Sequence, residues 1–161
     1  MTPAQICALP RPGLAAAMAA GRAFDPAVLA GSTYRGTSLG LPRWVERLTW
    51  KRFAKTFVGG RGYNTRIEQT GAWRPMVRRG APITFGHFVV VVERGAVVLD
   101  YSVDRGPLGA LRDPLVALDE RADLLLGRSL LAIAGRAIPT PSYFLLEREV
   151  TGAAGVVGAP T

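Results

Sequence analysis

His87 is the only histidine of the chain, and it lies in an apolar stretch that runs from Ile83 to Val103. Period-two alternation in an extended segment places Phe85, His87 and Val89 on one face. A histidine there could be a partly buried residue satisfied by one hydrogen bond, a polar anchor in a ligand pocket, or an acid–base catalyst. A metal site would need carboxylates alone to complete it, so we expect no metal.

Asp100 is the carboxylate that could act together with His87. A two-residue turn at Arg94-Gly95 would bring His87 opposite approximately Ser102, about one cross-strand step from Asp100. Such a pair on an apolar wall would serve as a pocket anchor or an acid–base dyad. The alternative is an outward Asp100 that is solvated or paired with an arginine.

Further polar residues could orient the head of a ligand. The predicted ligand-binding residues lie in three candidate strands and are Tyr63, Asn64, Arg66, Phe85, His87, Val89 and Tyr101. Lys51, Arg52 and Lys55 form a local basic patch, which could meet an anionic headgroup but is more simply a solvated strand face. Arg112-Asp113 is expected to be a charge pair at a surface edge.

Motifs for cofactors and nucleophilic catalysis are missing from the sequence. Gly59-Gly60-Arg61-Gly62 is rich in glycine but does not lead into a helix with Lys-Ser/Thr, so it is interpreted as a hairpin turn rather than a phosphate loop. No serine lies in a GxSxG elbow. We therefore expect no cofactor.

The elements that would position these residues are mainly strands. Residues 1–30 are interpreted as a helical segment, 31–149 as one β-barrel domain and 150–161 as a flexible tail. Helix-forming Leu14 to Ala20 ends at Gly21, and Asp25-Pro26 resembles an N-cap followed by proline. The predicted strands are separated by turn signals and cover 33–38, 50–58, 63–69, 72–78, 83–93, 96–103, 111–118, 124–134 and 142–149.

The segment 41–57 can be interpreted as one long helix or as a short helix followed by a strand. At 100° per residue, Trp44 and Leu48 fall on one side, whereas Phe53 and Phe57 fall nearly opposite. The apolar residues of the two halves would not share one face of a helix, so a short helix over 42–48 that leads into a strand is favoured.

Several of the predicted strands are apolar on both faces. Val89 to Val92, Leu124 to Leu126 and Tyr143 to Leu146 show this doubling, whereas a sheet with one wet face would alternate apolar and polar residues. A closed barrel covered on its outside, or the central strands of a sandwich, would explain it. The lumen could hold a small apolar ligand, it could be packed shut, or the outer apolar face could form a homodimer interface.

Composition narrows the class of protein. The net charge of +8 comes almost wholly from scattered arginines, so a nucleic-acid partner, which needs a gathered basic face with stacking aromatics, is not favoured. Cys7 is the only cysteine, which excludes an internal disulfide and fits a cytoplasmic location. No apolar run reaches the roughly 18–20 residues of a membrane-spanning helix.

A resemblance to a known family rests on Gly31, Tyr34 and Gly36. Over about residues 31–149 the sequence resembles the calycin superfamily of lipocalin-like and fatty-acid-binding-like barrels, nearest to the bacterial GXWXG type, with Tyr34 in place of the family tryptophan. The resemblance implies a closed antiparallel up-and-down barrel that binds a small hydrophobic molecule. It also implies that Arg148 stacks over Tyr34 in a cation–π contact.

The function expected from the sequence is therefore the binding of a small hydrophobic or amphipathic ligand in a barrel lumen. The alternative is a cofactor-free cyclase or isomerase of secondary metabolism that uses the same cavity, with His87 or Asp100 as the acid–base group.

Overall fold

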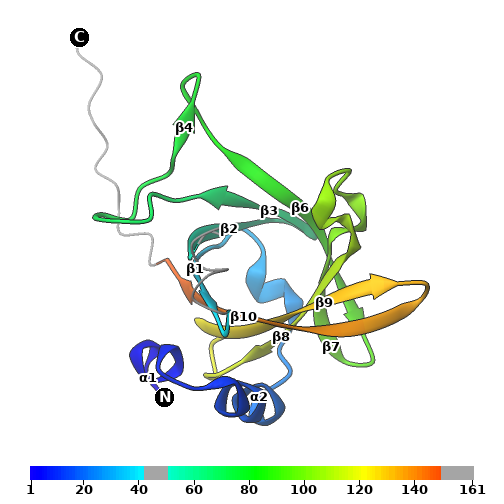
Figure 1. The fold of residues 1–161 in the computed structure, drawn as a ribbon. Helices are drawn as coiled ribbons and strands as arrows, with labels where there is room; N and C mark the ends of the chain where they lie inside the picture. Colours follow the sequence, from blue (N-terminus) through cyan, green and yellow to red (C-terminus); the bar gives the residue numbers. More distant parts are fainter. Residues whose placement is uncertain (42–50, 150–161) are drawn as a thin grey trace.

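The chain folds into a closed antiparallel barrel of eight strands (Figure 1). The computed structural model describes residues 1–41 and 51–149. Around the barrel the strands follow the order β1-β10-β9-β8-β7-β6-β3-β2, so strands that are successive in the barrel sequence are also neighbours in space. The barrel strands are β1 (Thr33–Leu39), β2 (Arg52–Val58), β3 (Arg61–Arg66), β6 (Thr84–Glu93), β7 (Ala96–Asp100), β8 (Leu111–Ala117), β9 (Leu124–Ile133) and β10 (Arg136–Arg148).

The predicted up-and-down barrel is confirmed, and three strand predictions need correction. Of 72–78 only the end is a strand, β4 (Val77–Arg78), which pairs with β5 (Ala81–Pro82) outside the barrel. The strand predicted over 96–103 ends at Asp100, where the carboxylate of Asp100 accepts a hydrogen bond from Ser102 N and begins a 3-10 turn, η2 (Tyr101–Val103).

The last strand is longer than predicted. β10 begins at Arg136 and contains Pro139 and Pro141, in a stretch that the sequence marked as a turn. The pairing with β9 shifts register between Pro139 and Tyr143. An irregularity of this kind is where a strand tolerates proline, which has no backbone N–H to donate.

The N-terminal segment covers part of the outer barrel wall with its two α-helices. It contains α1 (Pro3–Cys7), α2 (Arg11–Ala20) and the 3-10 helix η1 (Pro26–Leu29), with Gly21 at the end of α2 and the Asp25 side chain capping η1 as predicted. None of the described helices is long and apolar enough to cross a membrane. The predicted helix 42–48 and the tail 150–161 lie outside the described residues.

Two hydrophobic clusters explain most of the strands that are apolar on both faces. Leu125 and Leu146 belong to the cluster inside the barrel, whereas Leu126 and Leu145 pack outside it together with Ile6 and other residues of the N-terminal segment. The two clusters do not account for the whole apolar run of β6, because Val92 is 57% exposed. Cover on both faces is therefore found for Leu124 to Leu126 of β9 and Tyr143 to Leu146 of β10, but the outer end of β6 has none among the described residues.

Candidate functional site in the barrel lumen

The barrel lumen is packed at one end and hollow at the other. At the packed end Leu29 of η1 joins Tyr34, Phe57 and Phe88 in the hydrophobic cluster inside the barrel. At the other end lies a cavity of about 370 Å³, within the range of small-molecule pockets. Its wall is mostly apolar, and the hydrophobic residues that line it are Leu41, Phe53, Phe85, Leu108, Leu111, Pro141 and Phe144.

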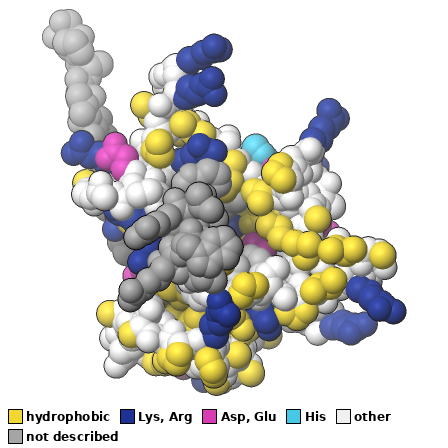
Figure 2. Space-filling view, viewed as in Figure 1, with side chains coloured by type: hydrophobic (Ala, Val, Ile, Leu, Met, Phe, Trp, Pro, Cys, Tyr) yellow, Lys and Arg dark blue, Asp and Glu magenta, His cyan; other side chains and the backbone are white. Residues whose placement is uncertain are grey.

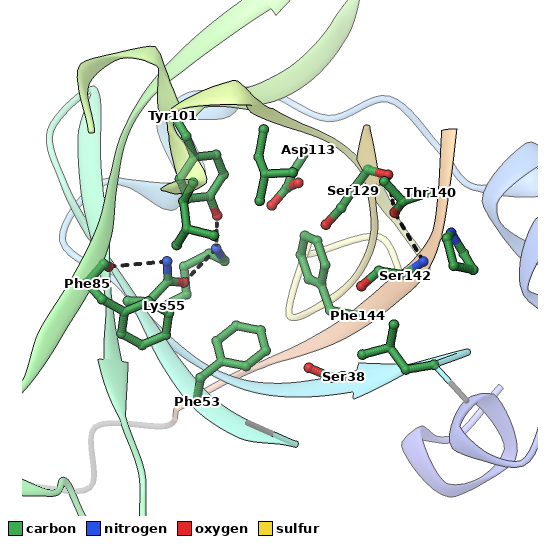
Figure 3. A pocket seen from close by; sticks show the side chains of 15 residues that line it. Ser38, Phe53, Lys55, Phe85, Tyr101, Asp113, Ser129, Thr140, Ser142 and Phe144 are labelled. Carbon is green, nitrogen blue, oxygen red and sulfur yellow. Dashed lines mark hydrogen bonds between the residues drawn. The ribbon is translucent and has the colours of Figure 1, made fainter. Parts of the chain in front are cut away.

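Polar groups are concentrated on part of this apolar wall (Figure 3). Lys55 comes from β2, Asn64 from β3, Tyr101 from η2 and Asp113 from β8. We call these four residues the inner cluster of polar groups. Each is at most 4% exposed. The hydroxyl residues Ser38, Ser129, Thr140 and Ser142 complete the polar part of the lining.

Lys55 is the central residue of the inner cluster. Its Nζ donates to Asn64 Oδ1 at 2.8 Å and to Tyr101 Oη at 2.6 Å. The side chain is 2% exposed, because strand alternation turns Lys55 to the same side as Phe53 and Phe57. An ammonium group has three N–H donors, so a charged Lys55 has one left for a molecule in the cavity.

The surroundings of the Lys55 amine are aromatic rather than acidic. Nζ lies 4.8 Å from the ring centroid of Phe88 and 5.3 Å from those of Tyr101 and Phe144. Burial in this setting lowers the pKa of Lys55 to about 8, while the negative charge of Asp113 acts in the opposite direction. Both the neutral amine and the ammonium ion are therefore accessible near neutral pH.

Asp113 supplies a carboxyl group to the same space. Alternation along β8 turns it inward between Leu111 and Leu115, and it is 3% exposed. Its Oδ1 is buried without a hydrogen-bond partner. Burial raises the pKa of Asp113, against the opposing effects of Lys55 and of the Ser129 and Tyr101 hydroxyls. An unpartnered buried oxygen is costly, and a ligand donor would relieve that cost.

Asn64 and Tyr101 fix the geometry around Lys55. Asn64 Nδ2 donates to the carbonyl of Gly86 at 3.0 Å, so its Oδ1 is held toward the lysine. The pKa of Tyr101 is raised well above its usual value, first by burial and then by Asp113. The phenol therefore keeps its proton and remains a donor at physiological pH.

The predicted ligand-binding residues other than His87 divide into three groups. Asn64, Phe85 and Tyr101 line the cavity; that they bind a ligand stays a prediction. Tyr63 lies instead in a groove on the outer side of the barrel. Val89 and Arg66 are half-buried and are not among the residues that line the cavity.

His87 faces away from the lumen, and the prediction that it shares a face with Phe85 is wrong. Its side chain is 58% exposed, with Nδ1 3.9 Å from Asp104 Oδ2. The cause is a β-bulge: Gly62 pairs with Phe88 and Asn64 with Phe85, so one extra residue of β6 fits between them. Gly86 adopts φ +56° at that point, and the bulge reverses the alternation that the sequence implied.

Asp100 does not form the dyad that was considered with His87. It lies opposite Val89, as the Arg94-Gly95 turn implied, but its Oδ2 is 3.3 Å from the guanidinium of Arg112. This is the arginine-paired alternative for Asp100. Neither Asp100 nor His87 lines the cavity.

Lys55 and Asp113 are the functional candidates that the sequence interpretation missed. Both were expected on the surface, as part of a basic patch and of an edge charge pair, and both are buried in the lumen. The signal was present: Lys55 alternates with Phe53 and Phe57, and Asp113 alternates with Leu111 and Leu115. Each charged residue thus occupied the apolar face of its strand.

The contact predicted between Arg148 and Tyr34 is confirmed. The guanidinium carbon of Arg148 lies 4.9 Å from the centroid of the Tyr34 ring, and Tyr34 Oη donates to the carbonyl of Ala122 at 2.8 Å. Gly31 adopts φ +73°. A Cβ on Gly36 would meet the Phe53 ring at 2.3 Å, so this position requires glycine. Tyr34, with Arg148 over its ring, belongs to the packed end of the barrel.

Among residues 1–41 and 51–149 no group of three or more His, Cys, Asp or Glu side chains could hold a metal ion. Comparison with known proteins gives no family: no protein-family model matches the chain, and no protein of curated function is detectably similar to it. The cavity and its inner cluster therefore have to be interpreted from their own geometry.

Proposed function

We propose that the protein binds one small amphipathic molecule in the barrel lumen. The apolar part of the ligand would pack against Phe53, Phe85 and Phe144, and its polar head would meet Lys55 and Asp113. The observation that carries the proposal is Lys55, a cationic side chain kept fully buried beside a cavity. Burying an amine and a carboxyl in an apolar lumen costs folding free energy, and a bound polar head would use both groups.

A calycin-type barrel is part of this proposal. The closed eight-stranded topology and the Arg148–Tyr34 contact support it, although tyrosine replaces the tryptophan of the GXWXG type. Barrels of eight strands can enclose one small ligand.

The test is a fluorescence titration with 1-anilinonaphthalene-8-sulfonate, followed by displacement with decanoic acid. Both probes combine an apolar body with an anionic head, so we expect one saturable site per chain. Lys55→Met should weaken binding about tenfold, the worth of one hydrogen bond to a charged group. Lys51→Met, a change of the only other lysine, which is exposed, should leave it unchanged. Absence of saturable binding, or equal loss in both variants, contradicts the proposal.

A second candidate function, a cofactor-free isomerase or cyclase, is favoured by the position of Asp113. A carboxyl with a raised pKa in an apolar cavity is suited to general acid–base catalysis. 5-Nitrobenzisoxazole tests for such a base, because removal of its C3 proton breaks the ring N–O bond and releases a coloured phenolate. Turnover by the wild type that is lost in Asp113→Asn supports this candidate, whereas equal rates would reject it.

A further inference from the structure

The lumen contains a single primary amine whose surroundings differ sharply from those of the other lysine. Lys51 and Lys55 are the only lysines of the chain. Lys51 is exposed, whereas Lys55 is 2% exposed and lines the cavity. Any chemistry of an amine inside the barrel therefore belongs to Lys55 alone.

The surroundings of the Lys55 amine favour its action as a nucleophile. Because burial lowers its pKa to about 8, about half of the Lys55 side chains carry a free lone pair at pH 8. Desolvation of a lysine in a hydrophobic pocket is one of the ways in which proteins activate an amine. The hydrogen bonds to Asn64 and Tyr101 hold Nζ in place against the cavity wall.

The acid needed by a carbonyl reaction is present in the same space. Figure 3 shows the Lys55 amine and the Asp113 carboxyl directed into one cavity. Asp113 Oδ1 has no hydrogen-bond partner, so this one oxygen of the carboxyl is available to a bound molecule. The apolar part of the wall, with Phe53, Phe85 and Phe144, would exclude water from the reacting groups.

We propose that Lys55 captures an aldehyde or ketone in the lumen as a covalent imine. This rests on the proposed function, because the carbonyl compound must first bind there. The neutral amine attacks the carbonyl carbon, forming a C–N bond, and a proton moves from nitrogen to the oxygen to give a carbinolamine. Asp113 then protonates the hydroxyl, the C–O bond breaks and water leaves. The products are a protonated imine and the Asp113 carboxylate as its counter-ion.

The experiment uses 6-methoxy-2-naphthaldehyde as the carbonyl probe and the corresponding naphthylmethanol as a non-covalent reference. The full chain is incubated with the aldehyde and sodium cyanoborohydride at pH 8, and the reduced adduct is located by intact-mass and peptide mass spectrometry. We expect one adduct per chain, on Lys55. It should be lost in Lys55→Arg and Lys55→Met and retained in Lys51→Arg.

Asp113→Asn provides an independent readout. At saturating aldehyde its adduct should form about a hundredfold more slowly, the lower end of what general acid catalysis contributes. Circular dichroism verifies that each variant is folded. An unchanged rate in Asp113→Asn would overturn the role assigned to this carboxyl.

The remaining outcomes separate the inference from the function on which it rests. If the alcohol binds but the aldehyde gives no adduct on Lys55, the imine is ruled out and the binding function stands. Labelling spread evenly over Lys51, Lys55 and the N-terminal amine also overturns the imine, because it would show ordinary amine reactivity. If neither naphthyl compound binds, both proposals fail.

Discussion

Lys55 and His87 lie close together in the barrel wall but have opposite surroundings. Lys55 pairs with Asn64 across β2 and β3, and Asn64 pairs with Phe85, two residues before His87. The lysine is buried among aromatic rings and polar partners, whereas the His87 ring stands outside beside Asp104. In this barrel the side of the wall on which a polar residue lies, rather than its residue type, decides whether it can meet a ligand.

None of the arginines within residues 1–41 and 51–149 lines the cavity. Figure 2 shows Lys and Arg side chains dispersed around one face, while hydrophobic side chains gather near the projecting β9–β10 hairpin. Ile133 and Ile138 of that hairpin are each close to half exposed. This hairpin thus exposes apolar side chains, but it lacks the buried polar groups that line the lumen.

The largest effect on the inner side is expected from Asn64→Ala. The substitution removes the acceptor of Lys55 and the donor to the Gly86 carbonyl, and leaving such groups buried and unpaired should lower the free energy of unfolding by about 3 kcal/mol. Thr56→Ala, which truncates a polar residue of the outer groove, should cost less than about 1 kcal/mol. Urea denaturation measures both, and similar losses would remove the distinction between the two sides.

Gly86→Ala tests the bulge that separates the two environments. Gly86 has φ +56°, and an added Cβ would lie 2.7 Å from Asn64 Nδ2. Strain and overlap should together cost about 2 kcal/mol. In the matched control, Gly60→Ala, the new Cβ meets nothing within 4 Å. Thermal unfolding compares the two variants, and an equal shift in both would show that the bulge carries no special constraint.

The bulge at Gly86, which reverses the alternation of β6, also shows which features of the site could be predicted from the sequence and which could not. Turn residues such as Arg94-Gly95 and the doubled apolar runs of β9 and β10 are local signals, and they led to the barrel. The bulge is not local, because it depends on how β6 pairs with β3. The inward positions of Lys55 and Asp113 could have been found from the apolar residues that flank them at i±2, had charge not been taken to indicate exposure.

The stability of the protein should depend on pH through Lys55. Its folded pKa of about 8 lies below the ordinary value of 10.5, so between these pH values the unfolded chain binds more protons and stability rises with pH. From pH 8 to 9.5 the wild type should gain about 1.5 kcal/mol relative to Lys55→Met. Urea denaturation at both pH values measures the difference. A constant difference, or a loss, would show that the buried amine is not destabilised in its charged form.

The smallest effect is expected on the outer side. His87→Ala should change the free energy of unfolding by less than about 0.5 kcal/mol, as is usual for exposed positions, and should leave decanoic acid binding unchanged. Calorimetric titration of the variant checks this. A loss of affinity comparable with that of Lys55→Met would show that His87 takes part in ligand binding. It would contradict the claim that only residues on the inner face of the barrel meet the ligand.

The most direct test of ligand binding in the lumen is an NMR measurement of intermolecular NOEs. It uses protein labelled at Leu and Ile methyl groups and unlabelled decanoic acid. The account predicts NOEs from the decanoate chain to the methyl groups of Leu108 and Leu111, which line the cavity. NOEs confined to Ile133 and Ile138 on the outer hairpin would place the ligand outside the barrel and contradict the account.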